Sequence, residues 1–204
     1  MEIKTKKELK FVIHADQIMN GFGGKSLFDK LKNFFFPNYI IDFLKELRKV
    51  SYYKHQRGIL NKVLLGVHYA RYRKLGMKLG FSIGWDALGY GVVIPHYGTI
   101  VVGGSNRIGN YAVLHTSTCI SDNGKIIGDG LYLSTGAKIT SKVKLGNGIS
   151  IGANSLVNKD CEQDNVLLGG MPAKVIRQTE IWYIRDSFDK KVERVEELKK
   201  RYGI

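Results

Sequence analysis

An aliphatic residue recurs at every sixth position through the middle of the chain, starting at Ile108. Written in sixes, the stretch reads IGNYAV, LHTSTC, ISDNGK, then one additional residue, Ile126, then IGDGLY, LSTGAK, ITSKVK, LGNGIS, IGANSL and VNKDCE. An α-helix has a period of 3.6 and a two-faced strand a period of 2, so neither produces this pattern. A solenoid does, because every coil turns its aliphatic residues inward and stacked coils share one core. Gly, Asn and Asp at fixed offsets suit the corners, where φ is often positive.

Apolar residues at helical spacing flank the repeat on both sides. Residues 38–79 predict two or three amphipathic helices, with apolar positions at Ile40, Phe43, Leu44, Leu47, Leu60, Val63, Leu64 and Val67. Residues 1–37 are expected to add one helix before the segment NGFGGKS and another before Pro37. A C-terminal helix is predicted from the stripe Ile181, Ile184, Phe188, Val192, Val195 and Tyr202. We expect that helix to pack on the end or side of the solenoid, where it would cover an exposed coil edge.

The chain therefore divides into three predicted parts and has a mainly β fold. Residues 1–80 form a basic helical region, residues 81–178 form the solenoid domain and residues 179–204 form the C-terminal helix. The composition fits a globular protein with a real core, since 44% of the 204 residues are hydrophobic and 25% are charged. A run of apolar residues long enough to span a membrane is missing, and the N-terminal sequence lacks the features of a signal peptide. Two cysteines, Cys119 and Cys161, offer neither a disulfide framework nor a metal motif, so we expect a reducing cytoplasm and no metal.

The net charge of +14 is concentrated near the N-terminus. Residues 1–80 hold 17 Lys and Arg against 6 Asp and Glu, whereas residues 81–177 hold 8 against 6. Such a region suits an anionic lipid surface, a phosphate-rich cofactor, an anionic glycan or nucleic acid, or it is simply a solvated helical face. No nucleic-acid-binding motif is present, so we expect no nucleic-acid partner. A phosphate-binding loop at GGKS is excluded, because the motif needs glycine where Met19 stands.

The repeat, with the segments IPHYGTIVVGG, RIGNYAVLHTSTCI, IGANSLVNKD and GGMPAKVI, resembles the hexapeptide-repeat acyltransferases of the left-handed β-helix type. Within them it resembles the serine acetyltransferase-like branch, and more narrowly the enzymes that O-acetylate capsular or surface-polysaccharide sugars. The resemblance covers residues 38–178 best. It implies a left-handed parallel β-helix, a homotrimer, and acetyl-CoA lying in a groove between neighbouring β-helices.

Acetyl transfer to a hydroxyl needs a base, because an alcohol is a poor nucleophile until it loses its proton. A histidine matches this task at neutral pH. The resemblance places the catalytic base at His96, where the family often has a preceding aspartate and this chain has Pro95. Asp86 is the nearest acidic residue in the sequence and is the candidate partner of His96.

His115 follows His96 by 19 residues, close to the 18 of a three-hexad coil, so the two imidazoles are expected on successive coils. His115 is a candidate acceptor-binding or second acid–base group, and a structural histidine in a turn is the alternative. Extending the period of six backward from Ile108 places His96 at an inward position, unless the segment VVGGSN shifts the register.

The spacing of 18 also pairs Thr135 with Ala153 and Ala137 with Ser155 on adjacent coils. The resemblance assigns these small residues to the acetyl-CoA groove and Lys174 to the CoA phosphates. Solenoid packing is the alternative role for each of them.

The sequence thus predicts an acetyl-CoA-dependent O-acetyltransferase acting on a sugar hydroxyl in polysaccharide or glycan biosynthesis. Direct attack within a ternary complex is sufficient, because CoA thiolate is a good leaving group. Serine O-acetylation and N-acetylation of an amino sugar are alternatives, and a non-catalytic β-helix scaffold is another. The segment SDNGKIIG is short and has no histidine, unlike the longer loop of serine acetyltransferases, and this favours the sugar. The expected location is the cytoplasm, with the basic N-terminal region available for peripheral contact with the inner face of the membrane.

Overall fold

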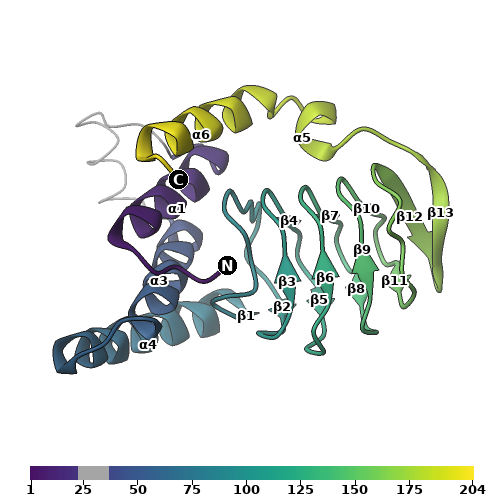
Figure 1. Ribbon diagram of the computed structural model, residues 1–204. Helices are drawn as coiled ribbons and strands as arrows, with labels where there is room; N and C mark the ends of the chain where they lie inside the picture. Colours follow the sequence, from purple (N-terminus) through teal and green to yellow (C-terminus); the bar gives the residue numbers. More distant parts are fainter. Residues whose placement is uncertain (23–36) are drawn as a thin grey trace.

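The computed structural model describes residues 1–22 and 37–204 and shows a helical region followed by a parallel β-solenoid (Figure 1). The helix expected just before Pro37 and the GGKS segment lie outside the described residues. The solenoid is the left-handed β-helix that the repeat and its resemblance predict, with about five turns.

Three parallel sheets form the walls of the solenoid, and each coil contributes to all three in turn. Sheet A contains β1 (Phe81–Ile83), β2 (Ile100–Val102), β5 (Thr118–Ile120), β8 (Lys138–Ile139) and β11 (Leu156–Val157). Sheet B contains β3 (Arg107–Ile108), β6 (Ile126–Ile127) and β9 (Lys144–Leu145). Sheet C contains β4 (Val113–Leu114), β7 (Tyr132–Leu133), β10 (Ser150–Ile151), β12 (Val166–Gly170) and β13 (Ala173–Gln178). All pairs are parallel except the last, β12 with β13, which is antiparallel.

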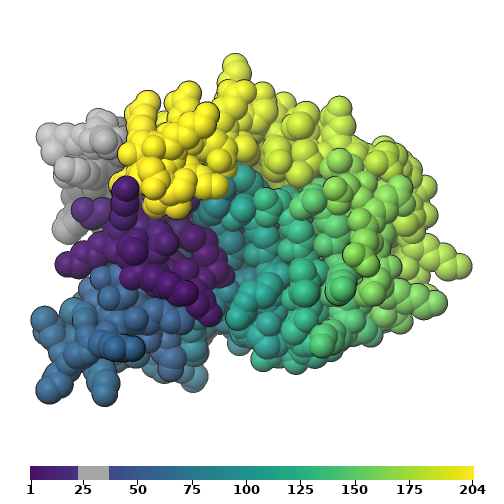
Figure 2. Space-filling model, in the orientation of Figure 1, coloured from purple at the N-terminus to yellow at the C-terminus, as the bar shows by residue number. Residues whose placement is uncertain are grey.

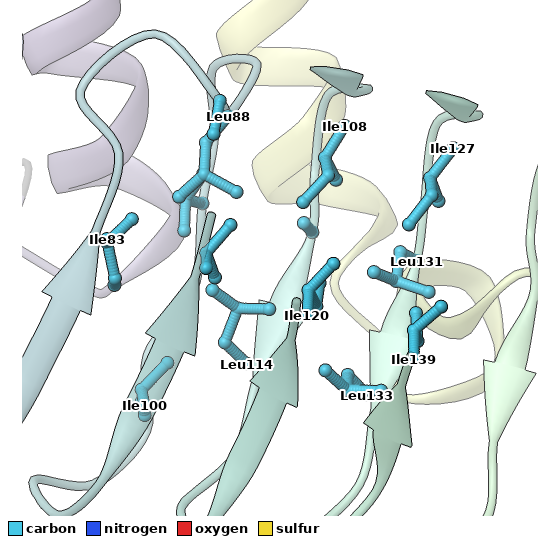
Figure 3. Close-up of a cluster of buried hydrophobic side chains, with 14 of the residues drawn as sticks. Ile83, Leu88, Ile100, Ile108, Leu114, Ile120, Ile127, Leu131, Leu133 and Ile139 are labelled. Atoms are coloured by element: carbon cyan, nitrogen blue, oxygen red, sulfur yellow. The ribbon is translucent and has the colours of Figure 1, made fainter. Parts of the chain in front are cut away.

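The aliphatic residues that open the nine hexads fill the interior of the solenoid, and each is at most 4% exposed. They are Ile108, Leu114, Ile120, Ile127, Leu133, Ile139, Leu145, Ile151 and Val157. Figure 3 shows six of them pointing into the space between the walls. Ile126, the residue that does not fit the period, is 55% exposed while Ile127 is buried. The register of the repeat, including its one insertion, was therefore predicted correctly.

The first coil is covered by helices. α3 (Tyr39–Lys54) begins at Asn38, whose side chain accepts hydrogen bonds from the backbone N–H of Ile40 and Ile41. α4 (Ile59–Leu79) ends at Gly80, whose φ of 81° requires glycine, and the chain then enters β1. α1 (Lys6–Met19) lies beside α3 and begins with a capping box formed by Thr5 and Glu8.

A buried ion pair fastens this helical region to the first coil. Arg48 Nε donates to Asp16 Oδ2 at 2.8 Å, and Arg48 Nη1 donates to the carbonyl of Leu88 at 2.9 Å. Asp16 Oδ1 also accepts from the backbone N–H of Val92 at 3.0 Å. Both side chains are almost fully buried, so these bonds fix α1 and α3 against the coil, since a buried charge without its partners would be costly.

The C-terminal segment packs along the side of the solenoid, one of the two places expected for it, but it does not cover the far coil edge. Strand β13 takes that place by pairing with β12. The chain then turns back through α5 (Trp182–Arg185), which lies along sheet C, where Trp182 Nε1 donates to the carbonyl of Tyr111 at 2.7 Å. Helix α6 (Asp189–Tyr202) ends against α1, so the two ends of the chain meet at the helical end of the molecule (Figures 1 and 2).

Candidate functional site

The two histidines lie at the same edge of the solenoid, where the chain passes from sheet C to sheet A; we call this the C/A edge. His115 stands between β4 and β5. His96 stands between the bridge Val93↔Val113, which belongs to sheet C, and β2. The expectation that both imidazoles occupy successive coils is therefore confirmed by the topology. The two imidazoles also interact electrostatically, because the charge of His96 helps to lower the pKa of His115.

The corner that carries His96 is two residues longer than the corner that carries His115. Eight positions separate the inward residues Ile94 and Val102, whereas six separate Leu114 and Ile120. The segment Pro95–Thr99 contains the extra residues, so the register shifts before β2 and not within VVGGSN. The longer corner places His96 on the surface, and the inward position obtained by extending the period is wrong.

His115 has a more enclosed environment than His96. Its Nε2 and the hydroxyl of Tyr132 are hydrogen-bonded at 2.9 Å, and the two ring centroids are 5.1 Å apart. Burial is the main cause that lowers the pKa of His115, and the charge of His96 adds to it. These causes favour the neutral form of His115, and the hydrogen bond to Tyr132 orients its ring.

A cluster beside His115 was not predicted from the sequence. Arg185 lies with its guanidinium carbon 4.9 Å from the ring centroid of Tyr132 and donates to Ser150 Oγ at 3.1 Å. Its Nε donates to Asp186 Oδ1 at 2.9 Å, and that hydrogen bond raises the pKa of Arg185. Tyr132 and Ser150 could have been found, because they continue the register of Val113 on the next two coils. Arg185 and Asp186 could not, since the return of the C-terminal segment has no counterpart in the repeat.

Asp86 is not beside His96. It lies where the chain leaves sheet A for sheet B, the A/B edge, because it stands between β1 and the bridge Leu88↔Ile108. There Oδ2 is 3.3 Å from His55 Nε2, and Oδ1 accepts a hydrogen bond of 2.5 Å from Ser51 Oγ. Within residues 1–22 and 37–204, no hydrogen bond or ion pair joins Asp86 to His96. The predicted pairing is corrected accordingly: Asp86 attaches α3 to the first coil.

The residues predicted for acetyl-CoA separate into surface and core positions. Thr135 and Ala153 are exposed at the C/A edge on adjacent coils, where the N–H of Asn154 donates to the carbonyl of Thr135 at 3.0 Å. Ala137 and Ser155 are also on adjacent coils, but both are buried. Ser155 Oγ accepts from the N–H of Gly170 at 3.1 Å, so these two residues shape the wall from inside and do not present their side chains to a ligand.

Lys174 is exposed on β13, next to Gly169 of β12 in the register. It therefore lies at the far end of the solenoid, on the last pair of strands. The C/A edge between it and His96 is lined mainly by small residues, namely His115–Ser117, Ser134–Gly136 and Gly152–Asn154.

A groove of about 570 Å³ lies at the A/B edge and is separate from the histidines. It is lined by Tyr69, Arg73 and Met77 of α4 and by Trp85 and Asp122 of the solenoid. The strands of sheet A run from the C/A edge to the A/B edge. Within a single chain, the groove and the two histidines therefore lie at opposite ends of these strands. In the described parts of the chain, no group of three or more His, Cys, Asp or Glu residues is arranged to hold a metal ion.

Comparison with known proteins gives the same fold. A crystal structure of serine acetyltransferase from Neisseria gonorrhoeae superimposes with a TM-score of 0.65, covering 90% of this chain and 72% of that one at 16% sequence identity. A structure described as serine acetyltransferase in complex with CoA gives a TM-score of 0.56 at 14% identity, covering 82% of this chain and 70% of that one. The chain has the serine acetyltransferase fold.

Sequence comparison points to the same group of proteins over a shorter stretch. The serine acetyltransferase of Buchnera aphidicola is 35% identical over 100 residues, which cover 45% of this chain and 36% of that protein. The chain thus spans little more than a third of the length of this curated relative. No family model matches.

Proposed function

We propose that this chain is an acetyl-CoA-dependent O-acetyltransferase in which His96 is the general base. The observation that carries the proposal is the exposed imidazole of His96 at the head of a solenoid edge of small residues, in the fold of the serine acetyltransferases. The similarity to proteins named serine acetyltransferase supports acyl transfer as the reaction class.

In the proposed reaction His96 takes the proton of an acceptor hydroxyl, and the oxygen attacks the thioester carbonyl of acetyl-CoA. The new C–O bond forms, the C–S bond breaks, and the imidazolium returns the proton to the departing CoA sulfur. Backbone N–H groups of the corners are available to stabilise the oxyanion. Because the lowered pKa of His115 favours its neutral form and Tyr132 orients it, we assign it to the acceptor hydroxyl or to a second proton-transfer step.

Acetyl-CoA is proposed to lie along the C/A edge. Thr135 and Ala153 would line the pantetheine chain, while Lys174 would attract the phosphates from the far end. Ala137 and Ser155 would contribute indirectly, by keeping the wall narrow. The homotrimer implied by the resemblance would add a neighbouring solenoid to this edge and would bring a second chain toward the histidines.

Two hydroxyl acceptors are proposed, each with its own support. Serine is supported by the names of the relatives and of the structures that share the fold. A sugar in glycan biosynthesis is supported by the short corner after β5, where the Nζ of Lys125 donates to the carbonyl of Ser121 at 2.6 Å and to Asn123 Oδ1 at 2.5 Å. This closed corner contains no histidine that could bind the amino acid, and because it lies at the A/B edge it would act on the histidines of a neighbouring solenoid in the proposed homotrimer. The reaction is placed in the cytoplasm, with the basic helical region at the inner face of the membrane.

The test measures CoA release with a thiol-reactive dye, using purified protein, acetyl-CoA and a panel of serine, amino sugars and nucleotide- or lipid-linked sugars. We expect release with one class of acceptor, and mass spectrometry of the product then identifies the acetylated hydroxyl or amine. Release with serine alone would select the serine acetyltransferase reaction. If the protein neither binds acetyl-CoA nor releases CoA with any acceptor, the proposal is wrong and a scaffold role replaces it.

A further inference from the structure

The outward face of α4 is apolar. Ile59, Val63 and Val67 follow one another at intervals of four residues, and they are 84%, 58% and 43% exposed. Met77, 72% exposed, has the same angular position as Ile59 near the other end of the helix, and Leu60, next to Ile59, is also 72% exposed. These five residues form what we call the α4 stripe. The sequence predicted apolar positions at Leu60, Val63 and Val67, and the structure shows that they face solvent.

The inward face of α4 is already occupied, so the α4 stripe cannot turn into the core. His68 Nδ1 is 2.6 Å from Glu46 Oε2 of α3, and the Tyr72 hydroxyl donates to the carbonyl of Ile83 at 2.5 Å. The ring of Tyr72 also stacks on Phe43, with the centroids 5.4 Å apart. These contacts fix the rotation of the helix about its axis.

Basic side chains border the α4 stripe. The helix contains Lys62, Arg71, Arg73, Lys74 and Lys78, all exposed, and it contains no Asp or Glu. At 100° per residue, Lys62 and Arg73 lie on one side of the stripe and Arg71 on the other, while Lys74 lies within it and Lys78 at the same angle as Leu60. Such a surface is complementary to a partner that offers an apolar region to the α4 stripe and negative charges to the basic side chains.

We propose that α4 binds the surface of an anionic lipid bilayer, with the α4 stripe in the interfacial region and the five cations among the headgroups. None of the helices in the described residues is long and apolar enough to cross a membrane, so the helix lies in the plane of the surface. A second copy of this chain fits less well, because it would bring five positive charges of each helix against five of the other. Figure 2 shows the α3–α4 lobe in blue, projecting beyond the first coil, where a flat surface can reach it. This surface acts independently of acetyl transfer.

The experiment is co-sedimentation of the full chain with vesicles of phosphatidylcholine alone and of phosphatidylcholine mixed with phosphatidylserine. We expect binding to the mixed vesicles only, decreasing as salt is added. The double variant Val63→Gln/Val67→Gln should bind at least tenfold more weakly, because both side chains leave the interfacial region. A matched control, Ile126→Gln, replaces an exposed isoleucine of the solenoid and should bind as the wild type does.

A second variant separates charge from apolar contact. Lys62→Gln/Arg73→Gln should weaken binding about fivefold for each charge removed. Circular dichroism should show that all three variants keep the wild-type fold, since every substituted side chain is exposed. Equal binding to neutral and anionic vesicles would overturn the proposal. So would no binding combined with a loss of oligomers in the Val63→Gln/Val67→Gln variant, measured by analytical ultracentrifugation, because the stripe would then be a contact between copies of this chain.

Discussion

The corners that carry His96 and His115 occupy the same edge of successive coils, yet they differ in length and environment. The first has two additional residues and presents an exposed imidazole, while the second is short and holds its imidazole against Tyr132. The difference shows how a solenoid produces unlike sites from one repeat. A local insertion changes the exposure of a side chain, while the strands on either side keep their register.

The largest effect should come from replacing the exposed imidazole. His96→Ala is expected to lower kcat for CoA release by about 10²- to 10⁴-fold, because general-base catalysis contributes that much. His115→Ala is the matched variant from the shorter corner and should lose less. The comparison would be reversed if His115→Ala were inactive while His96→Ala kept its rate, with both proteins folded by circular dichroism.

Backbone substitutions test the two corners next. Gly98 has a φ of 139°, and Ser117, the last residue of the next corner, has a φ of 62°. Gly98→Ala should destabilise the protein by about 1–3 kcal/mol, because alanine avoids that conformation and the added methyl would meet Thr116. Ser117→Gly should instead stabilise it by up to about 1 kcal/mol. Thermal denaturation of both variants measures the change in Tm. Equal changes in Tm for the two variants would contradict the predicted difference between the corners.

The hydrogen bond between His115 and Tyr132 at the shorter corner is expected to contribute less to the free energy of unfolding than the backbone conformation of Gly98 does. Tyr132→Phe removes the hydroxyl that contacts His115 Nε2 and should cost about 0.5–1.5 kcal/mol of unfolding free energy. It should also alter the pH dependence of the catalytic rate if His115 moves protons. Urea denaturation measures the first effect, and Tyr183→Phe serves as a control because Tyr183 has no hydrogen bond to either histidine.

The smallest effect concerns pH. Burial and the charge of His96 lower the pKa of His115 in the folded state, with the charge of Asp186 opposing them. The unfolded chain therefore binds more protons below about pH 6.5, so this residue's contribution to stability is present above that pH and is lost as the pH falls. His115→Gln should flatten the acid side of the stability curve between about pH 6.5 and the lowered pKa. An unchanged curve would show that another group controls it.

The solenoid could be predicted from the sequence almost residue by residue, whereas its corners could not. Each hexad must bury one aliphatic side chain, so even the single extra residue, Ile126, was visible as a break in the period. Corners have no such constraint. The two additional residues in the corner of His96 break the period of six for every residue before Val102, so the inward position predicted for His96 was wrong. The predicted pairing of Asp86 with His96 was wrong because two residues that are near in sequence need not lie at the same edge of the solenoid.

The helices and the C-terminal segment were predicted as secondary-structure elements, but the sequence did not show which of their faces are buried or what those faces pack against. Hydrophobic spacing locates an amphipathic helix but does not show which apolar stripe is buried, and α4 is apolar on both its inward and outward faces. Nor does the stripe of α6 specify its partner. Val195 is fully buried in a cluster with Phe11 of α1, a residue from the opposite end of the sequence.

This meeting of the two ends changes how the molecule should unfold. A stack of coils in which each touches only its neighbours is expected to fray progressively from an open end. Here the segment from β13 through α5 to α6 links the last coil to the helices that cover the first coil, so detaching one end exposes the hydrophobic cluster at the other. We therefore expect the coils to melt together, in a single cooperative transition.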